Sequence, residues 1–84
     1  MITILYFASL RENLGRGAEQ IALPTGTCDL KSLRALLRAR GAAWGQAMAD
    51  GSRVRAAVNQ DLAGDDAAIK DGDEIAFFPP VTGG

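Results

Sequence analysis

The sequence predicts an α+β fold, in which a mixed sheet of four to five strands has one main helix packed on one face. Three observations support this. Short apolar segments that alternate like strands lie at both ends, at residues 2–7 and 74–78. One amphipathic stretch with helical spacing lies between them. Finally, 84 residues correspond to one domain, 1–84, whose last residues, 79–84, we expect to form a flexible functional tail.

The first part of the chain reads as strand, turn, strand. Residues 2–7 alternate, with Ile2, Ile4 and Tyr6 on one side and Thr3, Leu5 and Phe7 on the other. A short helical turn is expected over 8–14, and 19–23 is predicted as a second strand that ends at Pro24.

The main helix is expected to begin after Thr27, a plausible N-cap, with Asp29 in the first turn where the helix dipole favours an anion. Gly41 suits its C-cap. An apolar stripe of Leu30, Leu33, Leu36 and Leu37 would face the sheet.

The second half predicts the remaining strands. Residues 42–49 could form a short helix with Trp44 and Met48 packed inward. A third strand is expected over 53–58 and a brief edge strand at 62–63. The sequence Asp71-Gly72-Asp73 favours a turn, the last strand covers 74–78, and Pro79-Pro80 ends it. Because the first and last strands are the most apolar, we expect them to be central and adjacent. This arrangement is the β-grasp, or ubiquitin-like, fold.

Composition excludes most side-chain chemistry. The chain has no histidine and one cysteine, Cys28, so it cannot build a zinc site, a catalytic triad or a disulfide framework. Its acidic residues lack the spacing of a calcium loop, so we expect no metal site. Cys28 is expected to be a small packed residue. A net charge of −1 without a basic run argues against nucleic acid and membrane partners. The start lacks the features of a signal peptide, so we expect a cytoplasmic protein.

The strand pattern leaves the second sheet face unexpectedly apolar. Leu5 and Phe7 in the first strand, and Ala76 and Phe78 in the last, should point away from the helix. Such a patch is typical of a partner surface. Alternatively, loops cover it, or the phase of the strands is the reverse.

The tail is the main candidate for chemistry. Extended, residues 79–84 span roughly 20 Å, enough to enter a pocket of another protein. Gly83 and Gly84 have no side chains and would pass a narrow channel. The terminal carboxylate could attack the α-phosphate of a nucleotide triphosphate and form an acyl-adenylate, which a sulfur or nitrogen nucleophile could then attack. The alternative is a frayed terminus that happens to end in glycines.

Several segments resemble one family. The ending Asp-Gly-Asp-Glu-Ile-Ala-Phe-Phe-Pro-Pro-Val-Thr-Gly-Gly at 71–84, Leu-Tyr-Phe-Ala at 5–8, Leu-Arg-Glu at 10–12 and Ala-Val-Asn-Gln at 57–60 resemble the small subunits of molybdopterin synthases. The resemblance implies a sulfur carrier in molybdenum cofactor biosynthesis. A ubiquitin-activating-like adenylyltransferase would use ATP to adenylate Gly84, and a sulfur donor protein would convert it to a thiocarboxylate. The chain itself would bind no cofactor and would not be catalytic alone.

The resemblance also implies partners and site residues. The tail would enter the synthase large subunit within a heterotetramer and give its sulfur to a pyranopterin precursor. Gly83 and Gly84 would be the reactive end, and the partner-binding residues would be Phe7, Arg11, Leu62, Phe78, Pro79, Pro80, Val81 and Thr82. Three alternatives stay open at this point: a protein modifier conjugated to lysines through Gly84, a binding module with an inert tail, and a carrier for thiamin or another thiolated product.

Overall fold

The computed structural model describes residues 1–49 and 52–80. The elements in chain order are β1 (Ile2–Tyr6), α1 (Ser9–Leu14), β2 (Ala18–Ile21), α2 (Leu30–Arg38), α3 (Ala42–Ala47), β3 (Arg55–Val58), β4 (Asp61–Ala63) and β5 (Glu74–Phe78). Each predicted element is present, with ends that lie within two residues of the expected ones.

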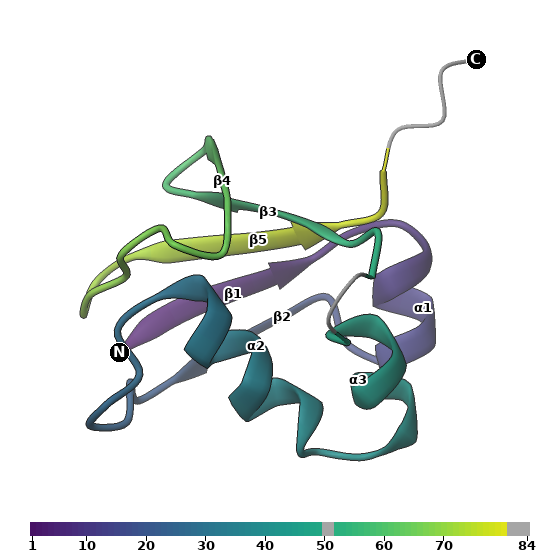
Figure 1. Cartoon of the computed structure of the whole chain (residues 1–84). Coiled ribbons are helices and arrows are strands. Elements are labelled where there is room, and N and C mark those ends of the chain that lie inside the picture. The colour runs from purple at the N-terminus through teal and green to yellow at the C-terminus, as the bar shows by residue number, and fades with distance from the viewer. Residues whose placement is uncertain (50–51, 81–84) are drawn as a thin grey trace.

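The strands form a mixed sheet in the order β2-β1-β5-β3-β4. β1 and β5 are parallel neighbours, and the other pairs are antiparallel. The prediction that the first and last strands are central and adjacent is therefore confirmed. Figure 1 shows α2 and α3 below one face of the sheet and α1 beside the end of β5, where the chain leaves towards its C-terminus. None of these helices is long and apolar enough to cross a membrane, as far as the described residues extend.

The core lies between the sheet and α2. The inward residues of β1 and β5 are almost completely buried, as is the apolar stripe of α2; these are Ile2, Ile4, Tyr6, Ile75, Phe77, Leu30, Leu33 and Leu37. Met48, after α3, is buried with them, and Trp44 of α3 packs partly against the core. The Trp44 ring meets the Tyr6 ring edge-on, with 5.4 Å between centroids.

Both ends of α2 differ from the prediction. Asp29, and not Thr27, is the N-cap: the Ser32 amide donates to Asp29 Oδ1 (2.8 Å), and the Asp29 amide donates to Ser32 Oγ (3.2 Å). Asp29 is the N-cap rather than Thr27 because Asp29 also forms a β-bridge with Ala68, which fixes its extended backbone. At the other end Ala39 is the C-cap, and Gly41 instead starts α3 with a φ of 149° that favours glycine.

A polar network joins the edge of the covered face to the loop after α2. Tyr6 Oη donates to Glu19 Oε2 (2.7 Å), and the Arg40 guanidinium donates to both oxygens of Glu19 (2.7 and 3.0 Å). Arg16 adds a contact of 3.2 Å to Glu19. Burial raises the pKa of Glu19, but the hydrogen bonds from Arg40 and Tyr6 outweigh it, so the pKa is lowered overall. Burial and the neighbouring carboxylate raise the pKa of Tyr6.

A second polar cluster closes the turn before β5. The turn predicted at residues 71–73 is present, but Asp73 is buried in it. Its carboxylate accepts hydrogen bonds from the Asn59 side chain (3.0 Å) and the Lys70 amide (2.9 Å), which lower its pKa. Asn59 in turn accepts from the Glu74 amide at 3.0 Å. The β3–β4 turn is thereby fixed to the start of β5.

Candidate docking face and tail root

The sheet face opposite α2 carries the residues that the strand pattern turns outward. Strand register places Leu5, Ala76, Ala57 and Leu62 side by side across four strands. Phe7 and Phe78 lie one step further along β1 and β5, next to the tail. We call this set, with Leu5, Phe7, Ala57, Leu62, Ala76 and Phe78, the docking face.

The docking face is exposed where it was expected to be. Phe7 is 47% exposed and Leu62 is 72% exposed, while Phe78 is half-buried. Their neighbours Tyr6 and Phe77 are buried on the other side of the sheet. The predicted phase of β1 and β5 is therefore confirmed, and the alternative of a reversed phase is wrong. The role of these residues in partner binding stays a prediction.

An unusual backbone conformation holds Phe7 at this position. The Phe7 amide donates to the Phe77 carbonyl (3.1 Å), and the Phe7 carbonyl accepts from the Leu10 amide (3.2 Å). Between them, Ala8 has a φ of 54° and a ψ of −131°, a region that residues with a Cβ rarely adopt. The chain thus turns sharply from β1 into α1 with Phe7 left at the corner. Sequence gave no sign of this strain because no glycine marks the turn.

Arg11 is exposed on α1, beside the same end of the sheet. Its side chain lies over Gly17: a Cβ at residue 17 would come within 3.1 Å of Arg11 Nε. Glycine at this position therefore leaves room for the arginine. The role of Arg11 in partner binding remains a prediction.

Pro79 and Pro80 form the root of the tail. Both are half-buried, and each lines a separate hollow. The hollow beside Pro79 lies between α1 and α3, and the hollow beside Pro80 lies along β3. The strand ends at Phe78, as predicted. The remaining predicted tail residues, Val81, Thr82, Gly83 and Gly84, lie outside the described residues.

No group of three metal-ligating side chains lies close together within residues 1–49 and 52–80. Cys28 is exposed, so the expectation that it is packed was wrong. Its carbonyl accepts from the Ile69 amide at 3.0 Å, and this backbone pairing fixes residue 28 with its side chain outside the core. The geometry thus combines an apolar docking surface with an emerging C-terminal peptide, and its chemistry would belong to that peptide.

Fold and site together define a ubiquitin-like β-grasp protein whose apolar open face adjoins a C-terminal Gly-Gly tail. Family comparison is more specific: the model of the ThiS family matches residues 4–84, and the chain belongs to that family. The molybdopterin synthase sulfur carrier subunit of Escherichia coli is 45% identical over 84 residues, covering all of both chains. The subunit of the same name from Haemophilus influenzae is 42% identical, also over both full lengths.

Solved structures agree in fold. Subunit 1 of a putative molybdopterin converting factor from Pyrococcus furiosus superposes with a TM-score of 0.76 at 28% identity, covering 95% of this chain and 97% of that one. Small archaeal modifier protein 1 of Haloferax volcanii gives 0.72 at 26% identity, covering 95% and 97%. A chain in the complex of subunits 1 and 2 of the molybdopterin-converting factor from Helicobacter pylori gives 0.62 at 28% identity, covering 99% and 97%.

Proposed function

We propose that this chain is the sulfur carrier subunit of a molybdopterin synthase. The observation that carries the proposal is the full-length identity of 45% to a sulfur carrier subunit, combined with an exposed apolar face at the root of a Gly-Gly tail. The open face would dock on the synthase large subunit, and the tail would reach that subunit's substrate.

The chemistry proceeds at the terminal carboxylate of Gly84. A carboxylate oxygen attacks the α-phosphate of ATP on a ubiquitin-activating-like enzyme, which forms the acyl-adenylate and releases pyrophosphate. A hydrosulfide equivalent from a sulfur donor protein then attacks the acyl carbon and displaces AMP. The resulting thiocarboxylate gives its sulfur to the pyranopterin precursor in the large subunit, and two such transfers complete the dithiolene.

The docking face explains how a short tail can be held. Ordering each tail residue costs about 1–2 kcal/mol of backbone entropy. Burial of an exposed phenylalanine contributes roughly 1.5–3 kcal/mol, so Phe7 and Phe78 together with Leu62 offset much of that cost. Gly83 and Gly84 also fit this proposal, because two terminal glycines could pass through a channel that is too narrow for side chains.

The decisive experiment is intact mass spectrometry of the protein after incubation with the activating enzyme, ATP and a sulfur donor. We expect the mass increase that corresponds to replacement of one oxygen by sulfur, located on Gly84. Deletion of Gly84 should abolish it and leave the thermal melt unchanged, because glycine has no side chain to pack. An unmodified wild-type mass in the presence of a competent enzyme would contradict the proposal.

A second function has one specific observation in its favour, the similarity to small archaeal modifier protein 1. In that case the activated Gly84 would be attacked by a lysine amine and form an isopeptide bond. The same incubation with cell extract distinguishes the two: conjugate ladders on other proteins without a thiocarboxylate would support the modifier.

A further inference from the structure

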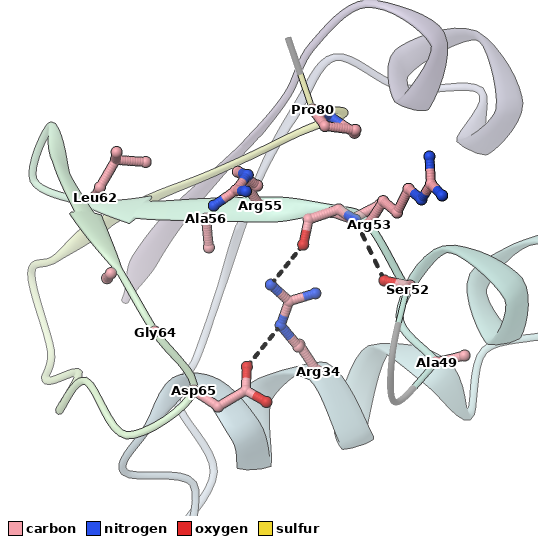
Figure 2. A pocket seen from close by; sticks show the side chains of 12 residues that line it. Arg34, Ala49, Ser52, Arg53, Arg55, Ala56, Leu62, Gly64, Asp65 and Pro80 are labelled. Carbon is pink, nitrogen blue, oxygen red and sulfur yellow. Dashed lines mark hydrogen bonds and ion pairs between the residues drawn. The ribbon is translucent and has the colours of Figure 1, made fainter. Parts of the chain in front are cut away.

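A basic hollow lies beside the tail root, and its arginines are not among the residues that the family resemblance implied. It encloses about 540 Å³ along β3, and its lining includes Pro80, Leu62, Arg34, Arg53, Arg55 and Asp65. Figure 2 shows Arg34 rising from α2 towards the start of β3, with Arg55 on the strand and Arg53 just before it. Three arginines thus line the hollow that Pro80, at the root of the tail, also lines.

The Arg34 side chain is held by partners within the fold. Its Nη2 donates to the Val54 carbonyl (2.9 Å), and its Nε lies 3.2 Å from Asp65 Oδ1. The guanidinium also stacks on the Phe77 ring, 5.3 Å from the centroid. Asp65 thereby neutralises Arg34, and the pair forms the floor of the hollow.

Arg53 and Arg55 are different. Both side chains are exposed, and neither forms a hydrogen bond or ion pair with any residue that the structure describes. Because Asp65 pairs with Arg34, the described lining of the hollow keeps an excess of two positive charges, on a chain whose net charge is −1. Uncompensated arginines at this density on a slightly acidic protein indicate a place that attracts carboxylates.

The hollow is continuous with the docking face. Strand register places Arg55 directly opposite Phe78, on the same side of the sheet. Leu62 belongs to both regions, and Pro80, which follows Phe78 by two residues, lines the hollow. A protein that covers Phe78 and Leu62 must therefore also cover Arg55.

We infer that Arg53 and Arg55 bind carboxylate side chains on the synthase large subunit, next to the opening that receives the tail. This inference rests on the proposed function. The planar guanidinium binds a carboxylate through two parallel hydrogen bonds, which sets orientation as well as attraction. Arg53 and Arg55 would fix the direction in which the tail enters the large subunit. The apolar contacts of Phe7, Leu62 and Phe78 are non-directional and would set this direction less well.

A nucleotide is a poorer occupant of this site. The four residues beyond Pro80 extend up to about 13 Å, so a phosphate attacked by Gly84 in an extended tail lies well away from the hollow. The anionic groups that pair with the arginines must therefore be carboxylates on the surface around the tail opening, and not the phosphates of the reacting nucleotide.

The test compares charge reversals that change net charge equally. Arg53→Glu and Arg55→Glu alter the hollow. Lys31→Glu, at an exposed position of α2, is the matched control. Binding of each full-length protein to the large subunit is measured by calorimetry at about 30 mM and about 300 mM salt, which changes charge screening strongly. We expect the dissociation constant of each arginine variant to rise about fivefold or more at low salt, and less at high salt.

The control should bind like wild type, and all variants should melt like wild type because the side chains are exposed. Arginine variants that bind as tightly as Lys31→Glu, while the wild type binds and transfers sulfur, would overturn this inference alone. A wild type that does not bind the large subunit would overturn both the inference and the proposed function. A loss of affinity that is the same at both salt concentrations would also contradict the inference, because salt screens ion pairs at a surface.

Discussion

Phe77 and Phe78 are consecutive in the sequence and lie in opposite environments. Phe77 is fully buried, stacks on Tyr6 with 6.2 Å between ring centroids, and lies under the Arg34 guanidinium. Phe78 is half-buried on the docking face, opposite Arg55. One strand thus contributes one aromatic ring to the core and the next to a surface.

The same contrast holds for the polar groups of the two faces. On the covered side, the charged groups Glu19 and Asp73 are satisfied by partners within the fold. On the open side, Arg53 and Arg55 have no partner among the described residues. If the proposed function holds, one face supplies stability and the other binds the partner, so substitutions should separate the two properties.

The largest effect is expected on the covered face. Phe77→Ala removes a fully buried ring and should lower the free energy of unfolding by about 3–5 kcal/mol. For a domain of this size that approaches the whole stability. Urea denaturation followed by circular dichroism measures the change. A loss below about 1 kcal/mol would show that the covered face does not dominate stability.

Phe78→Ala should give the converse result. Because Phe78 is half-buried, stability should fall by less than about 1.5 kcal/mol, whereas the dissociation constant for the large subunit should rise about tenfold or more. Titration calorimetry on the folded variant measures the binding. An unchanged dissociation constant would refute the assignment of this face to docking.

The strand alternation made this contrast predictable from sequence. A period of two residues assigns neighbouring side chains to opposite faces, and the burial of Ile4, Tyr6, Ile75 and Phe77 confirms the assignment. The element order was also predictable because alternating segments and a helical stripe differ clearly in period. The β-grasp topology followed from the apolar character of the first and last strands.

Other features depend on contacts that no local pattern reveals. Glu19 and Arg40 are 21 residues apart and meet only after the helix crosses the sheet. Thr27 and Asp29 are both good N-cap residues, and the bridge to distant Ala68 decides between them. Arg53 and Arg55 lie within the strand expected over 53–58, but the proximity of Arg55 to the tail root depends on the β3–β5 register.

A smaller loss of stability is expected from a substitution in the polar network around Glu19, which should leave binding by the docking face unchanged. Glu19→Gln weakens the pairing with Arg40 and should lower stability by about 1 kcal/mol without changing binding to the large subunit. Because the folded-state pKa of Glu19 is lowered, its contribution is complete above its ordinary value of 4.5 and is lost as pH falls through the lower folded value. Urea titrations of both proteins at several pH values should therefore show a difference that shrinks in acid. A difference that grows in acid would contradict the network.

The smallest effect concerns the strained corner that holds Phe7. Left-handed backbone costs a residue with a Cβ about 1–2 kcal/mol, and glycine loses roughly 0.5–1 kcal/mol in chain entropy, so Ala8→Gly should raise stability by about 0.5 kcal/mol. The same substitution at Ala43, exposed within α3, is the control and should lower stability by about 0.5–1 kcal/mol. Opposite signs in paired urea titrations would locate the strain at residue 8.

Binding of the Ala8→Gly variant to the large subunit tests whether the strained conformation of Ala8 helps to present Phe7. A glycine at residue 8 relaxes the corner, so Phe7 should be held less firmly and the dissociation constant for the large subunit should rise about twofold despite the greater stability. Stability and binding would then change in opposite senses at a single residue between the two faces. A variant that is both more stable and tighter in binding would show instead that the corner is a cost of the fold with no part in presenting Phe7.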